Sequence, residues 1–139
     1  MSENTQVSPV VAIRASFVKN SHVEVPVRPY SQPGPYSINI ELNHGNYPMN
    51  GEADHYIIEA SVEIVATEES GRELFKAAVA MEFVALVQNV PDEEKAPILE
   101  VYLPTQALPY LRSALSNLTM ASGYPQIVLP PMAIRSKNT

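Results

Sequence analysis

Two long alternating segments joined by a short turn constrain the fold of this chain more than any other feature. Residues 56–67 alternate apolar and polar side chains, and residues 72–87 carry an unbroken apolar face. Only the turn from Glu68 to Gly71 separates them, which predicts a β-hairpin. Residues 36–43 repeat the alternation, so we expect an antiparallel sheet with one face towards solvent.

The other segments of the N-terminal half predict a strand, a crossover segment and a loop. Residues 10–19 predict a further strand, and residues 26–35 hold several prolines, which is typical of a stiff, extended connection. Residues 44–54 predict a loop that carries two apolar side chains with no evident core role, Tyr47 and Met49. The apolar side chains of the first strand are predicted to share one face: Val11, Ile13, Ala15 and Phe17.

Helix is predicted only near the C-terminal end. Pro91 and the acidic residues after it indicate a first helical piece, because carboxylates favour the positive end of a helix. Leucines at spacings of three and four predict the main helix, with Pro109 in its first turn. Gly123 is the expected helix stop, and an extended segment follows it.

The length of 139 residues suits one domain with one core. We expect a disordered N-terminal tail over residues 1–8, a single domain over residues 9–134 and a short tail over residues 135–139. In the second hairpin strand the side opposite the apolar face is itself partly apolar. One small subunit covers one face of a sheet, so this strand predicts an oligomer interface.

Composition excludes several classes of partner. The chain has 9 basic and 15 acidic residues, for a net charge of −6. Nucleic acid and anionic membrane surfaces call for a basic surface instead, so we expect neither as a partner. Cysteine is absent, which rules out disulfides and thiolate metal sites. No apolar run approaches a transmembrane length and residues 1–8 show no signal pattern, so we expect a cytoplasmic protein.

Catalytic chemistry finds no support in the sequence. The histidines His22, His44 and His55 have no metal-ligand spacing, and there is no GxSxG elbow to single out a serine. The glycines form no phosphate-binding motif. We therefore expect no enzyme, no cofactor and no metal. The remaining signal is apolar surface in excess of one small core, which indicates binding.

The segment from Tyr102 to Met132 resembles the most recognisable stretch of the SecB protein-export chaperones. That stretch has Y-x-P, then P-Y-x-R at the start of a helix, then S-x-G-x-F/Y-P-Q-L/I-x-L-x-P. The N-terminal part is similar too, at Phe17, Lys19, Glu24, Pro26 and the alternating Ile38 to Asn43 run. The residues that match the C-terminal motif are Tyr102, Pro104, Pro109, Tyr110, Arg112, Gly123, Tyr124, Pro125, Gln126, Ile127, Leu129 and Pro131.

The resemblance implies an α+β fold in which C-terminal helices pack on one face of a four-stranded antiparallel sheet, assembled as a dimer of dimers, that is, a homotetramer. It also implies that unfolded polypeptides bind in long apolar grooves without ATP. It places a subunit-packing strand at Ala77, Val79 and Met81. The groove residues implied are Ile38, Ile40, Leu42, Tyr47, Met49, Leu111, Leu115 and Ile127.

Contact with the SecA motor is implied for an acidic sheet surface, where Glu24 is retained. The neighbouring positions here hold Asn20, Lys76 and Ala78, and the chain stops at Thr139 without the further helix and acidic tail of typical members. These departures weaken an acidic contact.

Three functions therefore stay open. The first is a chaperone that delivers preproteins to SecA for export. The second is a SecB-like chaperone devoted to one client, such as the antitoxin of a toxin–antitoxin pair. The third, of another class, is a small-ligand-binding or assembly protein on the same scaffold.

Overall fold

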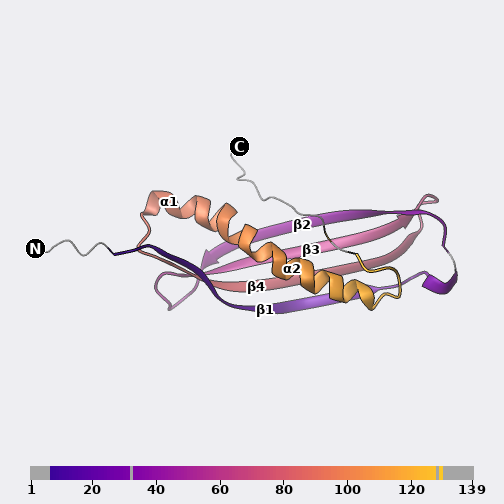
Figure 1. The fold of residues 1–139 in the computed structure, drawn as a ribbon, viewed down its shortest axis with the longest axis horizontal. Helices are drawn as coiled ribbons and strands as arrows, with labels where there is room; N and C mark the ends of the chain where they lie inside the picture. Colours follow the sequence, from indigo (N-terminus) through magenta and orange to yellow (C-terminus); the bar gives the residue numbers. More distant parts are fainter. Residues whose placement is uncertain (1–6, 32, 128, 130–139) are drawn as a thin grey trace, which may run out of the picture.

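A single antiparallel sheet and one long helical segment make up the molecule (Figure 1). The computed structural model describes residues 7–31, 33–127 and 129. Its strands, which lie in the order β1-β4-β3-β2, are β1 (Val10–Glu24), β2 (Tyr36–Pro48), β3 (His55–Glu68) and β4 (Glu73–Gln88). The expected antiparallel four-stranded sheet is confirmed, and the helix crosses one of its faces obliquely, leaving the other face open.

The predicted hairpin is confirmed as β3 and β4, the two central strands. Each strand buries alternate residues beneath the helix, and Val62 opposite Val79 marks the middle of this layer. At the far end Phe75 stacks on Tyr124, with ring centroids 4.8 Å apart. The fully covered side chains of the two strands form the core: Ile58, Ala60, Val62, Ile64, Ala66, Phe75, Ala77, Val79, Met81, Phe83, Ala85 and Val87.

Strand β1 is longer than predicted and carries two irregularities. It continues without interruption to Glu24, and its register with β4 shifts around Arg14 and again around Lys19. Each extra residue turns the following side chains to the other face. The expectation that Phe17 shares a face with Val11 was therefore wrong: Phe17 lies opposite Glu82 on the open face and is 50% exposed.

Strand β2 is also longer than predicted. It runs to Pro48, so residues 44–48 of the segment expected to be a loop belong to the strand, and Tyr47 pairs with Ile57. The actual turn is short, with Met49 donating its backbone N–H to the His55 carbonyl at 2.9 Å. Asp54 takes up a positive φ of 62° in this turn.

The first helical piece begins after Pro91 as predicted, but the main helix begins earlier than predicted. The helical segment consists of α1 (Asp92–Pro97), a π-helical turn η2 (Ile98–Tyr102) and α2 (Leu103–Met120). Pro104 lies in the first turn of α2, and Pro109, expected to be there, lies inside the helix. The buried row that includes Leu103, Ala107 and Leu111 provides enough apolar contact to override the unfavourable proline. The helix ends three residues before Gly123, which adopts φ 82°.

The crossover from β1 to β2 is fastened to the end of α2. A short 3₁₀ turn, η1 (Pro29–Ser31), packs against Gly123 so closely that a Cβ there would lie 2.8 Å from the proline ring. The Tyr124 hydroxyl donates to the Val27 carbonyl at 2.7 Å. Gly34 donates its N–H to the Glu68 carboxylate at 2.8 Å. These contacts fix where β2 starts.

The predicted tails fall largely outside the described residues, which exclude 1–6 and 130–139. Ser8, at the inner end of the predicted N-terminal tail, accepts a hydrogen bond from the Asn89 side chain at 3.2 Å.

Candidate functional site

A row of aliphatic side chains on the outer strand β2 faces the helix side of the sheet. Ile38, Ile40 and Leu42 lie opposite Ala66, Ile64 and Val62 on β3, which are fully covered. The three side chains themselves are only half-buried, although they pack against the core. They are incompletely covered because β2 is the last strand of the sheet. The resemblance noted above implies an apolar groove at this place, between the row and α2.

The two predicted groove leucines on α2 lie beneath this groove. Leu111 and Leu115 are both 0% exposed and hold the helix on the sheet. Burying a leucine fully contributes about 1.5–3 kcal/mol to stability, so their role here is in the core. In this conformation they offer no surface for contact with another molecule.

The segment after α2 turns back towards β2 (Figure 1). Ser116 donates its hydroxyl to the Ile127 carbonyl at 2.9 Å, and the Ile127 N–H donates to the Thr119 hydroxyl at 3.1 Å. The edge-on contact of Tyr124 with Tyr36, at 6.0 Å between ring centroids, joins the segment to the start of β2. Ile127 is half-buried and packs against the same core as the row on β2.

Tyr47 and Met49 are separated from the row. Side chains alternate along a strand, so Tyr47 points to the face opposite Ile40 and Leu42, where it lies beside Ile57. Met49 lies in the turn beyond β2 and is half-buried. The structure therefore keeps Ile38, Ile40 and Leu42 in one row on the helix side of the sheet and places Tyr47 on the open face.

Two polar atoms that sequence reasoning did not single out are unused beside the groove. His44 Nδ1 and Arg112 Nε are buried without a hydrogen-bond partner in the described part of the chain. His44 shares the helix-facing register of Leu42, and Arg112 lies one turn before Ser116 on the same flank of α2. An unmet buried hydrogen bond costs about 1–3 kcal/mol. β2 and α2 therefore each carry a buried polar atom without a hydrogen bond next to apolar side chains.

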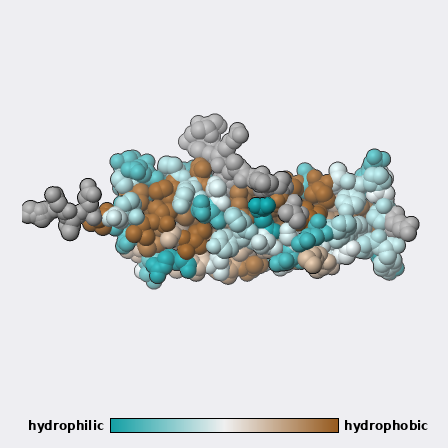
Figure 2. All heavy atoms as spheres, viewed as in Figure 1, coloured by the Kyte–Doolittle hydropathy of each residue, from teal (hydrophilic) through white to brown (hydrophobic). Residues whose placement is uncertain are grey.

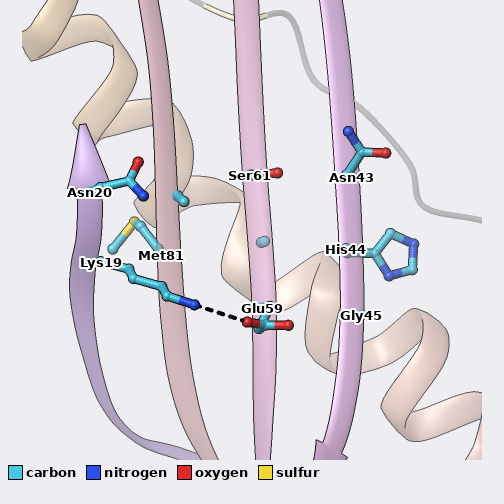
Figure 3. Close-up of a pocket in the computed structure, with 10 residues that line it drawn as sticks. Lys19, Asn20, Asn43, His44, Gly45, Glu59, Ser61 and Met81 are labelled. Carbon is cyan, nitrogen blue, oxygen red and sulfur yellow. Dashed lines mark hydrogen bonds and ion pairs between the residues drawn. The ribbon is translucent and has the colours of Figure 1, made fainter. Parts of the chain in front are cut away.

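The open face of the sheet has a different chemistry. It contains a shallow hollow of about 340 Å³, shown in Figure 3, floored by small residues such as Ser61 and Gly45. Lys19 reaches over this face to Glu59 at 3.5 Å and to Glu82 at 3.3 Å. Hydrogen bonds to Glu82 and then to Glu59 raise the pKa of Lys19. The His44 ring points away from this hollow.

Glu24, predicted to contact SecA, lies at the end of β1 on this open face. Its carboxylate is 2.8 Å from His22 Nε2, and that hydrogen bond lowers the pKa of Glu24. Lys76 pairs with Glu24 across the strands, and Ala78 pairs with His22. The predicted acidic contact is therefore a single carboxylate next to a histidine and a lysine.

The predicted subunit-packing residues lie beneath α2. Ala77, Val79 and Met81 are 0%, 2% and 7% exposed within one chain. Val79 forms part of the floor of an apolar hollow of about 450 Å³, whose sides include Val18 and Leu118. Any second subunit at this place would mainly contact those flanking residues.

Among the described residues, no group of three or more histidine and carboxylate side chains is arranged to hold a metal ion. None of the helices in the described part of the chain has the length and apolar character needed to cross a membrane.

Comparison with known proteins agrees with this architecture. The family model for SecB, preprotein translocase subunit, matches residues 4–136. A protein-export protein SecB of Neisseria meningitidis is 28% identical over 134 residues, which cover 95% of this chain and 88% of the relative. The SecB of Nitrosomonas europaea is also 28% identical, over 95% of this chain and 82% of its own length.

A solved structure has the same fold at low sequence identity. It is the SecB-like chaperone of Mycobacterium tuberculosis in complex with a peptide from an antitoxin, with a TM-score of 0.73, 12% identity, and coverage of 91% of this chain and 93% of that one. The family match spans nearly the whole chain, including both the sheet and the helix that border the groove. This chain belongs to the SecB family.

Proposed function

We propose that this protein is a chaperone that holds unfolded polypeptides, without ATP, in the groove between β2 and α2. The observation that carries the proposal is the half-buried row of Ile38, Ile40 and Leu42, which a folded monomer leaves incompletely covered. A chaperone must accept many sequences, so apolar burial suits it better than exact hydrogen-bond recognition. The partners of this protein in the proposal are unfolded preproteins, and its proposed location is the bacterial cytoplasm. It is a binding protein and not an enzyme.

The test is a refolding assay. A chemically unfolded protein is diluted into buffer with this protein and without nucleotide, and refolding is followed by fluorescence. We expect the wild type to slow refolding and Ile40→Arg to weaken client binding more than tenfold, because about 1.5–3 kcal/mol of burial is lost. Asn39→Arg is the matched control, since it adds the same charge on the open face of the same strand. Circular dichroism and thermal melting check that both variants fold.

Loss of holding in Asn39→Arg with full activity in Ile40→Arg would put the client on the open face and overturn this proposal. A wild type that slows no refolding, across several substrates, would favour a small-ligand or assembly role instead.

A second candidate function is that of a chaperone for a single client, such as an antitoxin. The surroundings of Glu24 favour it, because His22 and Lys76 lie beside the carboxylate that delivery to SecA would use. The solved relative in complex with an antitoxin peptide has the same fold. If the protein delivers preproteins for export, it should bind SecA, and Glu24→Lys should weaken that binding. A single-client chaperone predicts strong holding of one substrate and weak holding of unrelated ones.

We further propose that the chain forms a homotetramer, a dimer of dimers, through the apolar surface between β1 and α2. Figure 2 shows hydrophobic side chains gathered on the helix-covered face, most densely at the end near α1. Val11, Ile13 and Leu103 line a hollow at the start of β1, and Val18 and Leu118 line the larger one further along. A second copy of this surface would cover both hollows by two-fold symmetry.

Light scattering tests the assembly. Val18→Arg is expected to lower the mass of the particle, because Val18 is exposed beside the hollow. Phe17→Arg, its neighbour on the opposite face, is expected to leave the mass unchanged. Equal effects of the two variants would place the contact on the open face.

A further inference from the structure

The segment from Tyr124 to Ile127, here called the return strap, is held by side chains and not by regular secondary structure. Its residues belong to no helix or strand, and among the backbone–backbone hydrogen bonds of the described residues none involves them. Backbone groups of the strap bond instead to hydroxyls of α2 and of the turn after it. A segment held in this way can detach locally without breaking a sheet or a helix.

Two hydroxyls bind the Ile127 end of the strap. The Ser116 hydroxyl donates to the Ile127 carbonyl at 2.9 Å, and the Thr119 hydroxyl accepts the Ile127 N–H at 3.1 Å. Thr119 is 0% exposed and also donates to the Ser116 carbonyl at 2.9 Å, so its hydroxyl serves as both donor and acceptor. Ser116 and Thr119 lie one turn apart on α2 and together bind both backbone groups of one residue. They therefore recognise a peptide backbone and not a particular side chain.

The Tyr124 end of the strap is anchored more firmly. The Tyr124 ring is buried and stacks on Phe75 with ring centroids 4.8 Å apart, and its hydroxyl donates to the Val27 carbonyl at 2.7 Å. A buried aromatic side chain with a satisfied hydroxyl contributes more to stability than a half-buried aliphatic one. Ile127 is half-buried, and the two residues between it and Tyr124 are exposed. Within the strap, Ile127 is therefore the residue that detaches first.

The strap shares the helix side of the sheet with the aliphatic row of β2. It turns back towards β2 (Figure 1), and Tyr124 contacts Tyr36, at the start of that strand, with 6.0 Å between ring centroids. Ile127 and the row pack against the same core. Leu129, two residues beyond Ile127, is 1% exposed and belongs to that core. The strap thus brings to this surface what an unfolded client would bring, a backbone without regular structure and aliphatic side chains.

We propose that the return strap is a resident occupant of the surface that the proposed function assigns to clients, so that a client must displace Ile127 from Ser116 and Thr119. The inference rests on the proposed chaperone function and adds a regulation to it. An occupied surface binds with an affinity reduced by the fraction of molecules in which it is free. Short segments with little apolar surface therefore fail to displace the strap, and long unfolded segments succeed. Ile127 competes with the client and does not contact it, contrary to the role implied by the resemblance.

The first experiment uses the direction of one effect. The probe is labelled lactalbumin, kept unfolded by reduction and carboxymethylation, and its binding to the full chain is followed by fluorescence anisotropy. Ile127→Ala is expected to tighten binding about threefold, because the strap loses part of its apolar contact and is displaced more easily. If Ile127 contacts the client instead, the same substitution weakens binding, and the inference is wrong. Gln126→Ala, at the exposed neighbour, is the matched control and should leave binding unchanged.

The second experiment removes the hydroxyls. In the double variant Ser116→Ala, Thr119→Val, hydrogen exchange of the Ile127 amide, measured by NMR, is expected to become about tenfold faster, because both bonds to this residue are lost. Binding of the unfolded probe should tighten about fivefold in the same variant. Ser113→Ala, on the exposed side of α2, is the control for both measurements. Circular dichroism and thermal melting check that each variant folds.

Faster exchange at Ile127 with unchanged or weaker probe binding would show that the strap does not compete with clients, and would overturn the inference. Unchanged exchange would show that the two hydroxyls do not hold the strap, which would overturn it as well. In either case a wild type that slows refolding would still support the chaperone function itself. A wild type that neither slows refolding nor binds the probe would contradict that function first, and the strap would then have no client to exclude.

Discussion

The outer strands β1 and β2 bound the same sheet but are built differently. β1 shifts register twice, at Arg14 and Lys19, whereas β2 keeps one register from end to end. Bulges twist an edge and discourage pairing with another chain. The apolar surface near β1 is therefore suited to the assembly proposed above, and the regular β2 with its aliphatic row to the holding proposed above. In these proposals, assembly of subunits and holding of a client therefore use opposite edges of one sheet.

The largest effect on this difference between β1 and β2 is expected from a variant that weakens the packing of α2 on the sheet. Leu115→Ala is expected to lower the free energy of unfolding by about 2–5 kcal/mol, since Leu115 is fully buried between α2 and the sheet. Chemical denaturation monitored by circular dichroism measures the change. Ser113→Ala, on the exposed side of the same helix, should change it little. Holding and assembly should fail together in Leu115→Ala, and separate failure would show that the two edges do not depend on the helix alike.

A smaller effect concerns the place where the regular edge of β2 begins. The Gly34 N–H and then the Arg72 side chain lower the pKa of Glu68 below its ordinary 4.5. A carboxylate with a lowered pKa stabilises the fold above its unfolded value, and this contribution is lost as the pH falls through the folded value. Glu68→Gln is expected to be less stable than wild type at neutral pH. The difference in thermal midpoint should shrink below about pH 4.5. A difference that stays constant to lower pH would mean that the Gly34 contact contributes nothing through charge.

The smallest expected effect lies at the second bulge of β1. Lys19→Met leaves Glu59 and Glu82 opposed without a cation, so the thermal midpoint should fall modestly. Because Lys19 and Glu59 are exposed, the decrease should be smaller at high salt. Lys95→Met, which removes a pair with the exposed Asp92 carboxylate on α1, is the control. An effect of Lys19→Met that does not respond to salt would indicate that the bulge, and not the charge, holds the strand.

Period-two alternation was enough to predict the central hairpin and the antiparallel sheet, because burial on one face leaves a direct pattern in the sequence. The bulges of β1 left no such pattern: Arg14 and Lys19 look like ordinary polar positions, so Phe17 was assigned to the wrong face. Pro109 misplaced the start of the main helix, because tertiary burial outweighed a local preference.

The candidate groove was predictable only in part. A leucine that lines a groove and one that fills a core look alike in sequence, so the complete burial of Leu111 and Leu115 needed the structure. Tyr47 differs, because extending the alternation of Ile38, Ile40 and Leu42 by a few residues already assigns it to the opposite face. The unused His44 and Arg112 atoms had no signal in the sequence, since pairing depends on neighbours that only the fold brings together.

The hydrogen bond from Tyr124 to the Val27 carbonyl joins residues 97 positions apart, and it has a consequence for how the chain folds as it is made. The β3–β4 hairpin is local and can form early, but this contact waits until the C-terminal residues have left the ribosome. Synthesis at roughly 5–20 residues per second makes that delay several seconds or longer. Throughout it, the aliphatic row of β2 is exposed on an incomplete fold. A nascent copy of this chaperone therefore presents the same kind of surface as the polypeptides that we propose it holds.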